Sequence, residues 1–190
     1  GKVLIKRHLY QGATTLLIPF VETEEEARAA VSATQYPPAG LRGVAGATRA
    51  SGFGTTAGYL ENAADGLCVI LQIETGNALA QLEGIAGTEG VDAVFIGPSD
   101  LAASLGHLGN PGHPEVQAAI EDGLSRLKDL GVPAGTLAVT QEDAQHYIRL
   151  GFDLVAVGTD LGLLMSSAKA RLNHAHDAAQ KRVPVSHSDP

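Results

Sequence analysis

Two stretches of this 190-residue chain decide its fold: residues 67–75 read LCVILQIET, and residues 91–102 read VDAVFIGPSDLA. Each contains a short apolar run rich in Val, Ile and Leu, and neither run alternates with polar residues. Such runs are typical of strands that are buried on both faces of a parallel sheet. A polar residue or a Gly-Pro turn follows each run and indicates where the strand ends.

Working outward, the same kind of run recurs at Thr15–Phe20, Val132–Val139 and Leu154–Val157, and a short sixth strand is predicted at Leu41–Val44. Amphipathic stretches separate the runs, and we expect the main helices at about 3–11, 76–88, 114–130, 141–150 and 161–179. Strands that alternate with helices predict a parallel α/β fold. The chain has no Gly-rich nucleotide-binding motif, which favours a barrel over an open doubly wound sheet.

A complete (β/α)8 TIM barrel typically takes about 250 residues. The chain is shorter and begins inside a predicted helix, so we expect it to hold only the later βα units of such a barrel. We assign residues 1–180 to this N-terminally incomplete barrel domain. The polar residues 181–190 are predicted to form a disordered tail.

The composition excludes several classes of protein. The formal net charge is -8, from 13 basic and 21 acidic residues, which argues against nucleic-acid binding. No apolar run approaches the length of a membrane span, and the first residues lack the pattern of a signal peptide. A single cysteine, Cys68, allows no intrachain disulfide. We therefore expect a cytoplasmic protein without membrane or nucleic-acid partners.

Two carboxylates follow neighbouring predicted strands. Glu74 comes directly after the run at 67–73, and Asp100 follows the run at 91–96, 26 positions later. The carboxyl ends of parallel strands meet at one edge, so both side chains are expected at the same mouth. Paired carboxylates suit Mg²⁺ or Mn²⁺, and without a cation one of them would take a proton. The alternatives are a helix N-cap for Asp100 and a surface rim position for Glu74.

The turn between the two elements supports a binding function. Gly97 lets the backbone approach a ligand closely, and the N–H groups of Ser99 and Asp100 are expected to point at an anion at the start of the next helix. A substrate carboxylate would fit there. His107 and His113 flank another loop and could form a metal pair, although a solvated or capping role is commoner. No histidine lies at a strand end, so we assign none to catalysis.

Several motifs in a fixed order resemble the HpcH/HpaI family of metal-dependent class II pyruvate aldolases. They are TLLIPF at 15–20, YPPAGLRGV at 36–44, LQIET at 71–75, VDAVFIGPSDLA at 91–102, GNPGHPEV at 109–116 and VAVGTD at 155–160. The resemblance runs from about residue 3 to residue 172. The family includes the 4-hydroxy-2-oxoheptanedioate and 2-keto-3-deoxy sugar-acid aldolases.

The resemblance implies a (β/α)8 barrel in which Glu74 and Asp100 bind a divalent metal, Mg²⁺ or Mn²⁺, with Co²⁺ also possible. It places Gln72 along the site and assigns the pyruvate contacts to Gly97, Pro98, Ser99 and Asp100. The implied reaction is reversible aldol cleavage of 4-hydroxy-2-oxo acids to pyruvate and an aldehyde, through a metal-stabilised pyruvate enolate. Relatives assemble as hexamers, and the last predicted helix is expected in subunit contacts.

The chain departs from the family pattern in two ways. The first three strands of the family, with a His for proton transfer and an Arg that contacts the keto oxygen, have no counterpart here. No catalytic residue is therefore identified within this chain. Tyr10 also stands where relatives commonly carry an Asp near the site. The alternatives are a CoA-ester lyase of the citrate lyase β-subunit type and a truncated remnant without turnover.

Overall fold

The computed structural model of the chain describes residues 1–180, and the tail predicted at 181–190 lies outside the described residues. A parallel sheet has the strand order β1-β2-β3-β4-β5. Its strands are β1 (Thr15–Ile18), β2 (Cys68–Ile73), β3 (Ala93–Ile96), β4 (Ala134–Leu137) and β5 (Leu154–Ala156). The five longer apolar runs are thus confirmed as strands, and each strand pairs with the next one along the chain.

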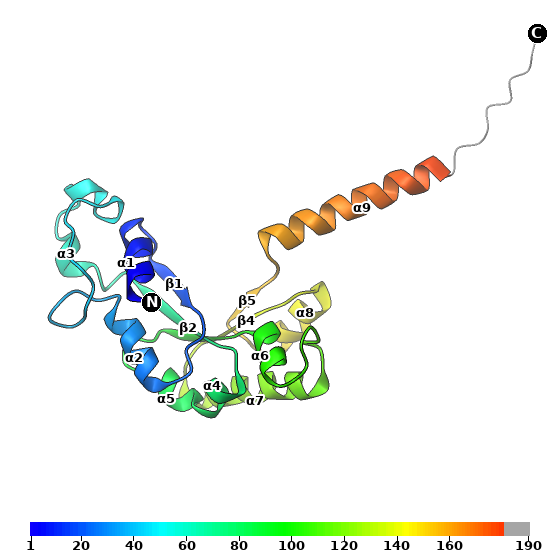
Figure 1. Cartoon of the computed structure of the whole chain (residues 1–190), viewed down its shortest axis with the longest axis horizontal. Coiled ribbons are helices and arrows are strands. Elements are labelled where there is room, and N and C mark those ends of the chain that lie inside the picture. The colour runs from blue at the N-terminus through cyan, green and yellow to red at the C-terminus, as the bar shows by residue number, and fades with distance from the viewer. Residues whose placement is uncertain (181–190) are drawn as a thin grey trace, which may run out of the picture.

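Helices lie before, between and after the strands along the chain. They are α1 (Lys2–Tyr10), α2 (Glu24–Ser32), the 3-10 helix η1 (Arg49–Gly54), α3 (Tyr59–Asn62), α4 (Gly76–Ala80), α5 (Leu82–Ala86), α6 (Pro98–Ser104), α7 (Pro114–Leu130), α8 (Gln141–Leu150) and α9 (Asp160–Gln180). The helix predicted over 76–88 is two short helices, because Gln81 adopts a non-helical conformation with φ -112° and ψ 15°. Figure 1 shows α2, α4, α5 and α7 along one side of the sheet and α9 projecting away from it.

The alternation of side chains along β2 separates the core from the site. Leu71 and Ile73 have no exposed surface and pack in the main apolar cluster, which includes residues of α5 and α7. Successive strand residues point to opposite faces, so Gln72 lies on the inner face. Glu74 directly follows the strand, two positions after Gln72. The outer face of β2 therefore forms the core, and the inner face, which carries the apolar Ile70, ends in the polar Gln72 and Glu74.

The prediction of a strand at Leu41–Val44 is wrong. The N–H of Leu41 donates to the carbonyl of Ser32 at 2.7 Å, and the N–H of Arg42 donates to that of Gln35 at 2.8 Å. These donors fold the segment back onto the end of α2, so they cannot join the sheet. As a result Arg42 is buried, with 2% of its surface exposed, and its guanidinium lies 4.4 Å from the ring centroid of Tyr36.

The described part of the chain, residues 1–180, contains no helix with both the length and the apolar character that a membrane span requires.

Gly40 makes the turn before Arg42 possible. A Cβ atom at this position would lie 2.4 Å from the carbonyl oxygen of Ser32 and 2.5 Å from that of Gln35. Both atoms belong to backbone that the turn itself holds in place. We expect Gly40→Ala to lower the free energy of unfolding by about 1–3 kcal/mol, as measured by urea denaturation.

Gly46→Ala is the matched control, because a Cβ there meets no atom within 4 Å. We expect its effect to stay within about 0.5 kcal/mol. Equal stabilities of the two variants would contradict the packing described for this turn.

Candidate functional site

Glu74 is the buried centre of the candidate site. Its side chain follows β2 and the residue is 2% exposed. The backbone N–H of Phe20 donates to Oε1 at 2.9 Å, and the side-chain amide of Gln72 donates to Oε2 at 2.5 Å. Each carboxylate oxygen therefore has one donor, and the orientation of the carboxylate is fixed.

Phe20 reaches Glu74 through an unusual backbone conformation. Its φ is 53°, in the left-handed region that a bulky side chain rarely adopts. Such a conformation costs on the order of 1–3 kcal/mol and persists where the surrounding structure enforces it. The next residue is held as well, because the N–H of Val21 donates to the carbonyl of Gln72 at 3.3 Å. The end of β1 is thus bent over the end of β2.

Asp100 lies in the first turn of α6, three residues after the N-cap Gly97. Burial raises the pKa of Glu74, and the charge of Asp100 and a side-chain hydrogen bond with it raise it further; the donors Phe20 and Gln72 partly offset this. The exposed Asp100 carboxyl group therefore lies close enough to the buried Glu74 carboxyl group to influence its charge. The alternative of an N-cap role for Asp100 is wrong, because Gly97 is the N-cap of α6. The alternative of a surface rim position for Glu74 is also wrong, because this residue is buried.

Gly97 lies so close to Gln72 and Glu74 that any side chain at this position would displace theirs. A Cβ atom there would lie 2.8 Å from Nε2 of Gln72 and 2.8 Å from Oε2 of Glu74. The N–H of Gly97 donates to the carbonyl of Ile73 at 2.9 Å, which joins the end of β3 to the end of β2. Pro98 is buried at the start of α6, and Ser99 is exposed beside it. The structure therefore brings Gln72, Glu74, Gly97 and Asp100 together.

The donor set fits a divalent cation that prefers oxygen. Within residues 1–180, neither Glu74 nor Asp100 forms a salt bridge with a basic side chain. Burial is the main cause of the raised pKa of Glu74, and the nearby charge of Asp100 raises it further. Mg²⁺ and Mn²⁺ prefer such oxygen ligands and leave positions for water or substrate.

Tyr10 does not belong to this cluster. It ends α1, its hydroxyl donates to the carbonyl of Gly43 at 2.5 Å, and its ring centroid lies 5.9 Å from the Arg42 guanidinium. α1 leads into the amino end of β1, whereas Glu74 follows the carboxyl end of β2. Position 10 therefore lies at the end of the sheet opposite to Glu74.

The sequence predicts site positions for Gln72, Glu74, Gly97 and Asp100 but not for Phe20. The apolar run at 15–20 predicts a strand up to Phe20, whereas β1 ends at Ile18. The contribution of Phe20 is its N–H group, which every residue except proline carries. Pro19 before it was the one signal of a break, since proline is unusual inside a strand.

Fold and site define a parallel α/β protein of the TIM-barrel type with a carboxylate pair at the carboxyl ends of neighbouring strands. The sequence model of the HpcH/HpaI aldolase/citrate lyase family matches residues 1–167. The chain belongs to this family.

Relatives and a solved structure agree with this assignment. The chain is 56% identical over 168 residues to a protein of Rhizobium etli named pyruvate aldolase, covering 88% of this chain and 66% of that protein. It is 53% identical over 169 residues to a hydroxypyruvate/pyruvate aldolase of Sagittula stellata, covering 89% and 67%. A crystal structure of an HpcH/HpaI aldolase/citrate lyase family protein from Burkholderia cenocepacia matches with a TM-score of 0.89 and 40% identity, covering 93% and 70%. The chain thus spans about two thirds of the length of these relatives.

The raised pKa of Glu74 predicts how stability depends on pH. The folded chain binds this proton more tightly than the unfolded chain does, so the free energy of unfolding falls as pH rises from 4.5, the ordinary value, through the raised pKa. Glu74→Gln removes this loss. In EDTA, we expect the variant to gain stability over the parent chain as pH rises, when urea unfolding is measured between pH 4.5 and pH 8.

Replacement of the exposed Glu89 by Gln is the control for removing a carboxylate at the surface. If the stability difference between the parent chain and Glu74→Gln did not change with pH, the raised pKa described for Glu74 would be refuted.

Proposed function

We propose that this chain carries the metal- and pyruvate-binding part of a carbon–carbon lyase that reversibly cleaves 4-hydroxy-2-oxo acids to pyruvate and an aldehyde. The observation that carries the proposal is the buried Glu74 carboxylate, held by two donors and close to Asp100. The names of the relatives from Rhizobium etli and Sagittula stellata support pyruvate as the shared product or substrate.

Glu74 and Asp100 would hold Mg²⁺ or Mn²⁺, and Co²⁺ would also suit their oxygen atoms. When bound, the cation supplies positive charge that stabilises the enolate form of pyruvate and so acidifies its methyl group. Gln72 and the Phe20 N–H keep the Glu74 carboxylate in one orientation, which is the role of outer groups around a metal ligand.

The start of α6 would bind the carboxylate of pyruvate. The first N–H groups of a helix have no acceptor within the helix. The N–H groups of Ser99 and Asp100 come shortly after Gly97, which has no side chain and so leaves room near Glu74. Pro98 lies between Gly97 and Ser99 and stiffens this turn. A cation held by Glu74 and Asp100 and these N–H donors would then act on the same small 2-oxo acid.

Proton transfer has no assigned group in this chain. We propose that the His and the Arg implied by the family resemblance are supplied from outside these 190 residues. The choice of aldehyde would also depend on groups beyond the cluster described here. A cytoplasmic location likewise stays a prediction.

Two rival functions make different predictions. A CoA-ester lyase of the citrate lyase β-subunit type would cleave a short CoA thioester, whereas the proposed aldolase would not. A remnant without turnover would bind metal and leave both substrates unchanged. Both of the curated relatives described above are named aldolases, which favours aldol cleavage over the thioester reaction.

In a protein that contains these 190 residues together with the proposed His and Arg, we expect pyruvate release from a 4-hydroxy-2-oxo acid, measured with lactate dehydrogenase and NADH, to require Mg²⁺ or Mn²⁺ and to stop in EDTA. Glu74→Gln and Asp100→Asn should each lower kcat/KM by at least about 100-fold, because even outer groups around a metal cost about 10–100-fold when removed. Glu89→Gln should retain the parent activity.

Three results would contradict the proposal. Turnover that persists in EDTA would exclude the metal, and turnover of the thioester would support the CoA-ester lyase. Metal binding without any pyruvate release would identify a remnant.

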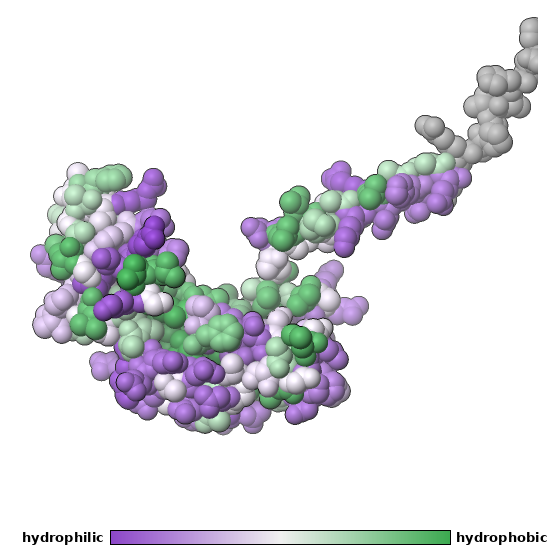
Figure 2. Space-filling view, viewed as in Figure 1, coloured by the Kyte–Doolittle hydropathy of each residue, from purple (hydrophilic) through white to green (hydrophobic). Residues whose placement is uncertain are grey.

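We also propose that the chain assembles with copies of itself, as the hexamers implied by the family resemblance do. Every residue of α9 is exposed. Its apolar side chains are Leu161, Leu163, Leu164, Met165 and Leu172, with exposed fractions of 47–66%. Figure 2 shows apolar atoms on this projecting helix, and exposed apolar patches of this kind mark interaction surfaces.

Light scattering after size exclusion tests the assembly. We expect a mass that is a multiple of 19.5 kDa, six-fold for a hexamer. A double substitution, Leu164→Glu with Met165→Glu, should shift the mass toward the monomer, because it puts charge on the apolar part of α9. Lys169→Glu on the same helix is the charge control. A parent chain that elutes as a monomer would contradict the assembly.

A further inference from the structure

A second group of metal-ligating side chains lies outside the carboxylate pair. His107, His113 and Glu115 each offer one ligand atom, and these atoms lie within 4.8 Å of one another. The loop after α6 brings the two histidines together, although five residues separate them. Its backbone bonds include Asn110 N–H to the carbonyl of His107 at 2.9 Å and His113 N–H to that of Asn110 at 3.1 Å. The loop is therefore closed by its own backbone.

The two imidazole rings are stacked, with centroids 3.5 Å apart and planes 15° from parallel. Nε2 of His107 lies 2.8 Å from Oε2 of Glu115, and the His107 side chain is 23% exposed. Nδ1 of His113 accepts from the N–H of Glu115 at 3.3 Å, which confirms the capping role considered for His113. This bond is long for a hydrogen bond, so the His113 ring is weakly held and can turn.

Two neighbouring imidazoles and a carboxylate are the ligand types that a borderline metal ion prefers, and the rings would have to turn out of their stacked arrangement to point their nitrogens at one ion. Imidazole suits Zn²⁺, Ni²⁺ and Cu²⁺, whereas Mg²⁺ prefers sites made of oxygen alone. A tetrahedral Zn²⁺ lies about 2.0–2.1 Å from nitrogen and oxygen ligands, which places its ligand atoms about 3.3 Å apart. The ligand atoms in this chain are already within 4.8 Å, so small side-chain rotations would close the site.

We propose that His107, His113 and Glu115 form a second metal site, selective for Zn²⁺ or a similar transition-metal ion and distinct from the carboxylate pair at Glu74 and Asp100. The ion would join the loop after α6 to the first turn of α7. Because α6 begins at the turn that carries Asp100, a closed loop would hold the far end of that short helix in place.

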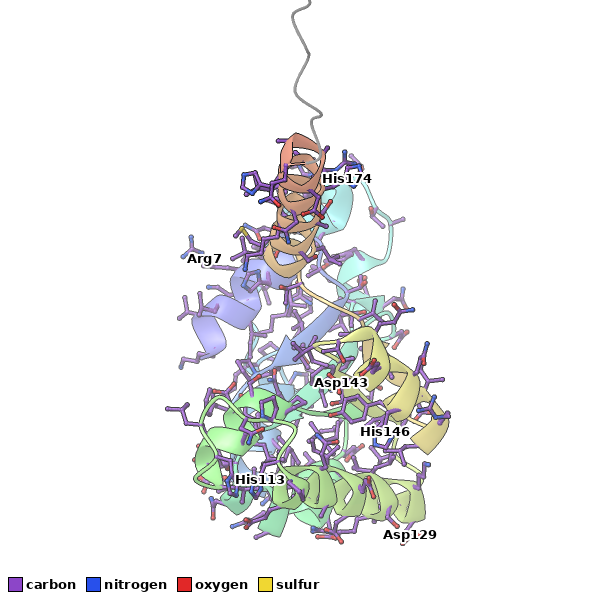
Figure 3. The ribbon with its side chains drawn as sticks, turned by 90° about the vertical axis from the view of Figure 1, so that its right-hand side faces the viewer. Arg7, His113, Asp129, Asp143, His146 and His174 are labelled. Carbon is purple, nitrogen blue, oxygen red and sulfur yellow. The ribbon has the colours of Figure 1, made fainter. Side chains whose placement is uncertain are left out.

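The chain offers a matched control. Nε2 of His146 on α8 lies 3.7 Å from Oε1 of Glu121, so this histidine is near one carboxylate, and among residues 1–180 it belongs to no cluster of three ligands. Figure 3 shows His113 at the start of α7 and His146 on the separate helix α8. A single histidine and carboxylate at the surface should bind Zn²⁺ much more weakly than three ligands do.

The test titrates Zn²⁺ into the metal-free full chain in the presence of millimolar Mg²⁺, with a chromophoric chelator as competitor. His107→Gln and His113→Asn remove one ligand each, and Asn at position 113 keeps a side-chain oxygen that can cap α7. We expect each variant to bind Zn²⁺ at least about tenfold more weakly than the parent chain, since even outer groups around a metal cost about 10–100-fold. His146→Gln and Glu74→Gln should retain the parent affinity.

Melting temperatures without metal verify that each variant is folded, and Zn²⁺ should raise the melting temperature of the parent chain and of the two control variants only. Two results would overturn the proposal. One is an affinity within twofold of the parent in both His107→Gln and His113→Asn. The other is a loss of Zn²⁺ binding in Glu74→Gln, which would place the ion at the carboxylate pair.

Discussion

The buried carboxylate of Glu74 is the group on which the arrangement at this end of the sheet depends. A charge that is 2% exposed beside a second carboxylate is unfavourable unless its surroundings compensate for the lost water. The backbone N–H of Phe20 donates to Glu74, which requires a left-handed conformation at Phe20. The side-chain amide of Gln72, on the same face of β2, is the second donor. Gly97 completes the arrangement by leaving the space that a side chain would fill. Three neighbouring strands thus converge on one side chain.

The repulsion between Glu74 and Asp100 connects stability to function. Burial, and after it the charge of Asp100, raise the pKa of Glu74, so the metal-free folded chain loses stability as pH rises. A divalent cation would remove the repulsion and recover that stability. The same positive charge would act on a bound 2-oxo acid. The feature that weakens the metal-free fold is therefore the one that the proposed chemistry uses.

Much of the fold and of the candidate site could be predicted from the sequence, because short local patterns indicate the strands, the helix ends and the carboxylates that follow the strands. The apolar runs around Leu71 and Val94 identified the central strands, and the glycines at 131 and 151 marked the ends of α7 and α8. Glu74 and Asp100 were found because parallel strands bring their carboxyl ends together. Phe20 was missed, since its role rests on a backbone N–H and not on its side chain. The segment after Gly40 was misassigned because its donors bond to the end of α2, a contact that apolar patterning does not encode.

The central claim is that Glu74 and Asp100 jointly hold a divalent cation next to the pyruvate-binding turn. The most direct measurement is an anomalous difference map from crystals of the chain grown with Mn²⁺ and pyruvate. We predict one peak between the two carboxylates, with the pyruvate carboxylate at the N–H groups of Ser99 and Asp100. Mn²⁺ located elsewhere, with Glu74 still bonded only to Phe20 and Gln72, would contradict the claim.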